Sequence, residues 1–237
     1  MPFFRTLLLL PLVGLIHCEG PRYYSDRQAL KLQELPALKV LILRHPLSYF
    51  SKTKQISQGI DHDLIADFAK TYGKKVEFKA YRNEDDLIAA YKRGEGHIAA
   101  GRFPRAFVET HADVIGPDYE SASLSVFCRK RVDAATEKDL NGLDIISFER
   151  NKNVVSHQEL VKSIPTARIQ VWLNGSTARA FSEISNSHAD CLIANSNEGV
   201  FHLKEFSNLE FKFKLKDNFS LNWMIAEQQD FLNPLMR

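Results

Sequence analysis

Leu38-Lys39-Val40-Leu41-Ile42-Leu43-Arg44 opens the stretch that decides the fold, and this stretch extends to Phe103. Two short apolar runs within it, 39–43 and 97–101, have the length and composition of buried strands in a parallel sheet. The segments between them space their apolar residues as helices do. A strand–helix–strand–helix–strand order predicts an α/β fold, in which loops at one edge of the sheet bind ligands.

Local signals support this order. Asp61 lies where the first helix should begin, since negative charge suits a helix N-terminus, and Gly73 suits a left-handed position at its end. Residues 76–81 alternate as a strand does. Asn83 can cap the next helix, which Gly94 closes.

The remaining elements follow from the same reasoning. We predict a loop at 104–112, a crossover segment at 113–119 and a strand at 123–128. In the second half we predict strands at 143–148, 168–173, 189–196, 209–215 and 220–226, and helices at 153–163, 176–184 and 197–203.

Composition narrows the function classes. Apolar residues make up 44% and charged residues 25% of the 237 residues, which is ordinary for a folded protein. Lys and Arg number 31 against 29 Asp and Glu, and a net charge of +2 argues against a nucleic-acid partner. The chain has no nucleophile elbow, phosphate-binding glycine loop or dinucleotide fingerprint. The eight His residues lack metal-ligand spacing, so we predict no metal and no cofactor.

The N-terminus has the features of an export signal. Arg5 precedes the apolar run 6–16, which is shorter than the roughly 20 residues that a membrane span needs. We therefore predict a signal peptide at 1–18 and a polar linker at 19–37. The residues before Cys18 are similar to a bacterial lipobox, although His17 departs from its small residue. Acylation of Cys18 and simple proximity to the cleavage point both stay open.

Two further cysteines, Cys128 and Cys191, lie in separate strand-like segments. Export to an oxidising compartment would permit a disulfide between them. We favour two buried free thiols, because free Cys packs as a small hydrophobe.

Several motifs together resemble one family. Gly59-Ile60-Asp61 ahead of Leu64-Ile65-Ala66 resembles the first-helix signature of the family 3 bacterial solute-binding proteins. Residues 94–101 resemble that family's small-residue turn and following strand, with His97 in place of the usual Asp. Within the family, residues 44–49 and 99–101 are most similar to the binding domain of membrane-bound lytic transglycosylase F. The resemblance covers roughly residues 38–223.

The resemblance implies a two-lobed, periplasmic-binding-protein-like (Venus flytrap) fold with three-layer α/β/α lobes. Lobe 1 would comprise 38–115 plus 220–237 and lobe 2 would comprise 120–216, with a hinge near 116–128 and 217–224. The family adds a further helix after the return strand, and transglycosylase F continues into a catalytic domain. Neither fits before Arg237, so we expect a C-terminally short, non-catalytic chain.

The family's binding chemistry suggests candidate residues. An Arg beyond the buried strand holds the ligand carboxylate in amino-acid-binding members, and here Arg102 or Arg105 would serve, unless both are surface charges on a loop. An Asp that meets the amino group is replaced by Asn195, which can instead cap the next helix. The predicted ligand-binding residues are Arg44, Tyr49, Phe50, Arg102, Arg105, Tyr119 and Asn195. The aromatic residues among them can equally pack within the fold.

The sequence thus predicts an exported, non-catalytic solute-binding protein. It would capture a small polar ligand, such as an amino acid, a peptide or a muropeptide, between two lobes in the periplasm or on the periplasmic side of a membrane. Expected partners are a membrane permease or a cell-wall lytic enzyme, with membrane contact only through a lipid anchor and no nucleic acid. Two alternatives stay open: a truncated or split lytic transglycosylase, and a degenerate structural version of the fold.

Overall fold

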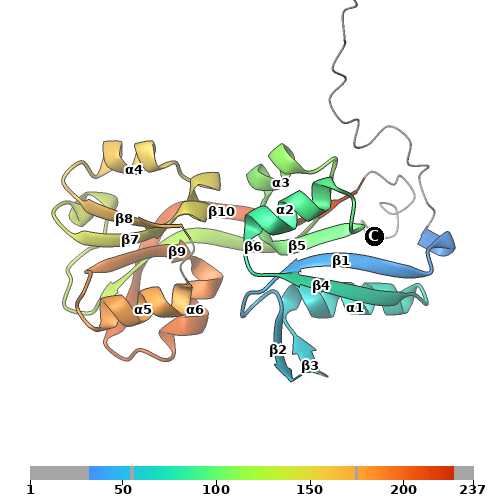
Figure 1. Ribbon diagram of the computed structural model, residues 1–237. Coiled ribbons are helices and arrows are strands. Elements are labelled where there is room, and N and C mark those ends of the chain that lie inside the picture. Colours follow the sequence, from blue (N-terminus) through green and yellow to red (C-terminus); the bar gives the residue numbers. More distant parts are fainter. Residues whose placement is uncertain (1–31, 54–55, 174–175, 227–237) are drawn as a thin grey trace, which may run out of the picture.

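The computed structural model describes residues 32–53, 56–173 and 176–226 (Figure 1). The predicted signal peptide, Cys18 and most of the predicted linker lie outside the described residues. No helix within the described ranges combines the length and apolar character needed to cross a membrane.

The described part of the chain forms two α/β lobes that share one sheet. Eight strands follow the order β4-β1-β5-β10-β6-β9-β7-β8. Two of them, β6 (Val114–Arg129) and β10 (Leu209–Ile225), pair antiparallel with each other and run from one lobe into the other (Figure 1). These two strands therefore connect the lobes. The α/β fold class with two lobes, predicted from the sequence, is confirmed.

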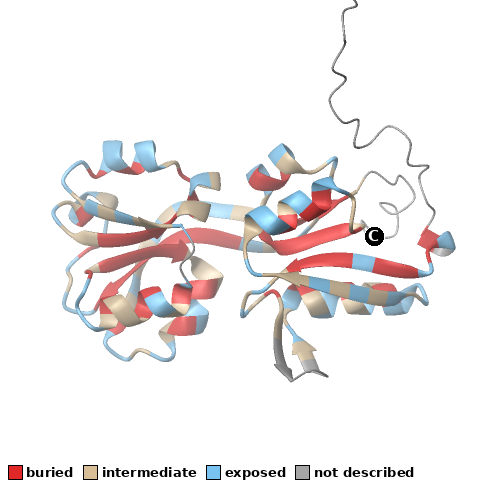
Figure 2. Cartoon of the chain, in the orientation of Figure 1, coloured by how far each residue is buried: buried red, intermediate tan, exposed pale blue. Residues whose placement is uncertain are grey.

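The first lobe is built on three parallel strands. Its elements are the short 3-10 helix η1 (Leu32–Glu34), β1 (Ala37–Leu43), the hairpin β2 (Phe50–Thr53) and β3 (Ile56–Gln58), α1 (Ile60–Thr71), β4 (Lys75–Tyr81), α2 (Glu84–Lys92), β5 (Ile98–Pro104) and α3 (Arg105–His111). Helix α1 covers one face of this part of the sheet, and α2 and α3 cover the other (Figure 1). Strand β1 is buried on both faces, since its side chains contribute to the apolar clusters of both (Figure 2). The burial of Val40, Leu41 and Ile42 explains the short apolar run that predicted this strand.

The second lobe repeats this plan. Its elements are η2 (Glu137–Leu140), β7 (Asp144–Phe148), η3 (Glu149–Asn153), α4 (His157–Ser163), β8 (Arg168–Trp172), α5 (Thr177–Ser185), β9 (Cys191–Asn195) and α6 (Ser196–Leu203). Strands β7, β8 and β9 are parallel, with α4 on one face and α5 and α6 on the other (Figure 1).

Four local predictions need correction. Residues 104–112 are not a loop, because α3 buries Phe107 and Val108 against the first lobe. The predicted crossover segment at 113–119 and strand at 123–128 form the single strand β6, and the strands predicted at 209–215 and 220–226 form the single strand β10. The helix predicted at 153–163 is divided between η3 and α4, because Ser156 forms a capping box that begins a new helix. The hairpin of β2 and β3 was not predicted.

The preferred state of the cysteines was also wrong. Cys128 and Cys191 form a disulfide. They lie directly opposite each other on the neighbouring strands β6 and β9, and their Cα atoms are 4.1 Å apart. The sequence placed both residues in strands, but it did not show that these strands are paired.

Candidate functional site

The largest described cavity lies between the two lobes and has a volume of about 530 Å³. The first lobe contributes the end of β1, the loop after it and the start of α2. The second lobe contributes η3, the start of α5 and one residue of α6. Because both lobes line it, the cavity is where a bound molecule would contact them together.

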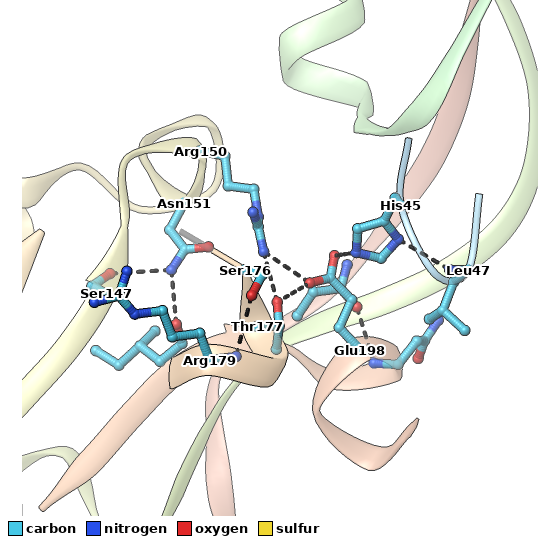
Figure 3. A network of polar contacts seen from close by, with 12 residues as sticks. His45, Leu47, Ser147, Arg150, Asn151, Ser176, Thr177, Arg179 and Glu198 are labelled. Atoms are coloured by element: carbon cyan, nitrogen blue, oxygen red, sulfur yellow. Dashed lines mark hydrogen bonds and ion pairs between the residues drawn. The ribbon is translucent and has the colours of Figure 1, made fainter. Parts of the chain in front are cut away.

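Glu198 of α6 lies at the centre of a polar network whose other members, His45, Arg150 and Thr177, line this cavity (Figure 3). Its carboxylate accepts a hydrogen bond from the Thr177 hydroxyl at 2.6 Å and one from Arg150 Nη2 at 2.9 Å. His45 of the first lobe places Nε2 at 3.3 Å from the same carboxylate. The backbone N–H of Leu47 donates to His45 Nδ1, so in a neutral ring the proton lies on Nε2, toward Glu198. This contact therefore joins the two lobes.

The local structure explains how the second lobe presents these groups. The Ser176 side chain caps α5, which places Thr177 in the first turn. The amide of Asn151 donates to Ser147 Oγ and to the Ile193 carbonyl, which fixes the turn η3. The Arg150 guanidinium lies 4.2 Å from the centre of the Phe148 ring and next to Glu198.

The pKa values of two carboxyl groups in the cleft are shifted in opposite directions. Burial alone would raise the pKa of Glu198, but attraction by Arg150 and His45, with hydrogen bonds from His45 and Thr177, holds it well below its ordinary value. Burial raises the pKa of Glu84 at the start of α2, and Arg150 offsets this only in part. Neighbouring cations and hydrogen bonds thus stabilise the buried charge of Glu198, whereas they offset the burial of Glu84 only in part.

The wall formed by the first lobe carries charges without partners. The side chains of Arg44, Arg82, Glu84 and Asp85 line the cavity. None of the four makes a side-chain hydrogen bond or ion pair with another described residue. Among the residues predicted from sequence, Arg44 is therefore placed on the cavity with its charge available.

The predicted aromatic residues Tyr49 and Phe50 lie away from the described cavities. The Tyr49 ring packs near His62 and Phe78, with centroid distances of 5.7 and 6.0 Å, and its hydroxyl accepts a hydrogen bond from Ser57. Phe50 begins β2.

Arg102 and Asn195 lie beside a smaller cavity of about 50 Å³ at the base of the cleft. Arg102 is only 5% exposed, has φ +60° and forms an ion pair of 2.5 Å with Glu120. Glu120 also accepts a hydrogen bond from Asn197, so this contact chain runs from β5 to α6. The Asn195 side chain accepts a hydrogen bond from the Asn197 backbone at 2.9 Å and caps α6, as its alternative interpretation predicted.

Arg105 and Tyr119 are engaged near the hinge strands. Arg105 forms ion pairs with Glu109 and Asp118 at 3.0 and 3.4 Å. The Tyr119 ring stacks on Trp223 with a centroid distance of 4.9 Å, and burial raises the pKa of its hydroxyl well above the ordinary value. The binding roles predicted for all seven residues remain predictions.

Sequence reasoning missed Glu198, Arg150 and Thr177, and it did not identify His45 as a member of the site. Arg150 and Thr177 are 48 and 21 residues from Glu198 along the chain, so no short motif joins them. The available signal was positional, because Arg150 follows the end of β7 and Thr177 opens a capped helix. Within the described residues, no three or more His, Cys, Asp or Glu side chains gather as a metal-binding group.

Sequence comparison finds relatives of one kind. No protein-family model matches the chain. Membrane-bound lytic murein transglycosylase F of Maricaulis maris is 27% identical over 234 residues, covering 96% of this chain and 50% of the relative. The protein of the same name from Nitrosospira multiformis is 24% identical over 203 residues, covering 85% and 42%. The chain therefore spans about half the length of these relatives or less. The matched half is their N-terminal binding domain, and their catalytic domain lies outside the match.

Solved structures show the same fold. The holo structure of ArgBP from T. maritima has a TM-score of 0.67 at 15% identity and covers 84% of this chain and 87% of its own. An ancestral cationic amino acid solute-binding protein has a TM-score of 0.70 at 20% identity and covers 86% and 88%. The chain thus has the two-lobed fold of amino-acid solute-binding proteins, and its homologues are the N-terminal binding domains of membrane-bound lytic murein transglycosylase F.

Proposed function

We propose that this chain captures a small polar ligand, an amino acid or short peptide with a carboxylate, in the cleft between its lobes. The observation that carries the proposal is a cavity of about 530 Å³ that both lobes line and whose lining includes charged side chains without a partner among the described residues. Binding sites for small molecules usually measure about 300–1,000 Å³ and contain a few polar groups that fix orientation. The solved neighbours also include an ancestral arginine-binding protein bound to arginine, which supports this ligand class.

Hinge closure would couple binding to a change in shape. A ligand that touches both walls makes more contacts when the lobes are closed, so it stabilises the closed state. The bending segments are parts of β6 and β10, near the predicted positions 116–128 and 217–224. The predicted lobes, 38–115 plus 220–237 and 120–216, would move as units.

Arg44 and Arg82 would hold the ligand carboxylate. A guanidinium offers a planar pair of donors that matches two carboxylate oxygens. Arg102 and Arg105, the residues favoured from sequence, already bind carboxylates of the protein itself. Arg44 and Arg82 line the same cavity and have no such partner among the described residues.

The cellular role would follow from the relatives. We place the chain in the periplasm or on the periplasmic side of a membrane, where it would feed a permease or regulate a cell-wall lytic enzyme. The second role is favoured by the match to lytic transglycosylase F, in which the aligned half is a binding domain. Its ligand would then be a peptide released from the cell wall.

A thermal-shift screen against amino acids, short peptides and muropeptides tests the proposal. A ligand at 100 times its dissociation constant should stabilise the protein by about 2.7 kcal/mol. The double variant Arg44→Ala/Arg82→Ala should lose the shift and keep its melt without ligand, whereas Arg179→Ala, an exposed arginine outside the cavity, should keep both. A cooperative melt that no ligand shifts would contradict the proposal.

A further inference from the structure

The side chain of Glu84 lies in the cleft and is not required for helix α2 to begin. It is the first residue of α2 and lines both the large cavity and the smaller one at its base. The cap of this helix is already made, since Asn83 Oδ1 accepts the Asp86 N–H at 2.8 Å. Asp85 and Asp86 supply exposed negative charge to the same turn. Glu84 is therefore not needed to begin the helix.

The surroundings of Glu84 leave its charge uncompensated. Its side chain has no hydrogen bond or ion pair with another described residue, and burial raises its pKa. The two cations across the cleft already bind carboxylates: Arg150 binds Glu198 at 2.9 Å, and Lys152 binds Glu149 at 2.8 Å. A half-buried carboxylate without a partner destabilises the empty protein, and a cation that enters the cleft would relieve this.

The acidic groups of the second lobe at this cleft already have partners. Asn195, which lines the smaller cavity, is neutral, and its side-chain oxygen caps α6. Glu198, close by on α6, is already bound by Arg150, Thr177 and His45. Two carboxylates of the first lobe, Glu84 and Asp85, line the cavity without a partner among the described residues, and of these Glu84 is half-buried whereas Asp85 is exposed.

We propose that Glu84 is the specificity determinant of the cleft and accepts the ammonium or guanidinium group of the ligand. The cleft then selects ligands that carry a cationic group as well as a carboxylate. The carboxylate would bind at Arg44 and Arg82, so the first lobe holds both ends of the ligand and the second lobe closes over them. This inference rests on the proposed function and adds the charge type of the ligand.

Calorimetric titration with matched probe pairs tests this inference. The pairs are L-arginine with L-citrulline, which lacks the guanidinium charge, and L-alanyl-L-alanine with its N-acetyl derivative, which lacks the ammonium charge. The wild-type protein should bind the more cationic member of at least one pair about tenfold more tightly or better, the range for a charge-assisted hydrogen bond. Glu84→Gln should lose this preference, and Glu84→Asp should keep part of it. Asp86→Asn is the matched control, since it removes the same charge from the same helical turn outside the cavity, and it should keep the full preference.

The possible results are distinct. Equal affinities within every pair for the wild-type protein, or an undiminished preference in a folded Glu84→Gln variant, would overturn the role of Glu84 and leave the binding function intact. Failure of all four probes to bind the wild-type protein would count against the proposed function itself. Circular dichroism of each variant confirms that the compared proteins are folded.

Discussion

Replacing Glu198 by Gln removes the charge on which the polar network of the cleft depends. The carboxylate accepts three contacts, from Thr177, Arg150 and His45. Contacts of this type contribute about 1.5–3 kcal/mol each. The amide oxygen of Gln can keep one of them, and water screens part of the loss because the Arg150 side chain is 33% exposed. We expect the free energy of unfolding to fall by about 2–4 kcal/mol.

The pH dependence of this effect has a definite sign. The pKa of Glu198 is held well below its ordinary value of 4.5, so around that pH the folded protein binds fewer protons than the unfolded chain. The stabilisation from Glu198 is therefore complete above pH 4.5 and is lost as the pH falls below 4.5 toward the folded-state pKa. Gln does not titrate, so the difference between wild type and variant should narrow in acid.

Urea denaturation followed by circular dichroism, at neutral pH and below pH 4.5, measures both effects. Glu205→Gln is the control, because this carboxylate is 60% exposed near the end of the same helix. The control should stay within about 0.5 kcal/mol of wild type. A Glu198→Gln variant as stable as the control, or a stability difference that does not change with pH, would refute the account of the network.

Three further predictions concern the frame and the ligand site. Replacing Cys128 and Cys191 by Ala should lower the free energy of unfolding by about 4 kcal/mol, which follows from the chain-entropy relation for a separation of 63 residues. Equal urea midpoints for the wild type and the double variant would contradict this. Gly59→Ala should destabilise by about 2 kcal/mol or more, because φ is +139° and a Cβ would lie 2.1 Å from a backbone oxygen, whereas Gly73→Ala has open space and should lose about 1 kcal/mol. Thermal unfolding of both variants checks this, and equal losses would contradict it. Glu84→Gln should be at least as stable as wild type at neutral pH without ligand. The pKa of Glu84 is raised in the folded protein, so the stability of the wild type falls as the pH rises through this pKa, whereas Gln does not titrate. A variant less stable than wild type at neutral pH would contradict the burial argument.

The sequence predicted much of the fold because the decisive signals are local. The short apolar run at 39–43 predicted a buried strand, and the structure has β1 there, with side chains in the apolar clusters of both faces. Asn83 and Gly73 marked the ends of helices where the structure has them. Helix α3 was missed because its first residue follows a proline and no side chain caps it.

Pairings between distant segments could not be read in this way. The disulfide depends on β6 lying beside β9, and no local pattern states which strands are neighbours. The same holds for the contact of His45 with Glu198, which joins two lobes. Arg44 was identified because it begins the segment 44–49 that carries the family resemblance, directly after β1. Glu84 was missed because a carboxylate at a helix start already has an ordinary explanation.

Blocking the cleft tests the central claim most directly. Ala178 lies on the cavity wall at the start of α5, and Ala89 is an exposed residue of α2 outside the described cavities. The strongest ligand from the thermal-shift screen would be titrated by calorimetry into wild type, Ala178→Trp and Ala89→Trp. The account predicts equal binding by wild type and Ala89→Trp and a loss of at least about tenfold in affinity for Ala178→Trp. Wild-type affinity in a folded Ala178→Trp variant would place the ligand elsewhere and contradict binding between the lobes.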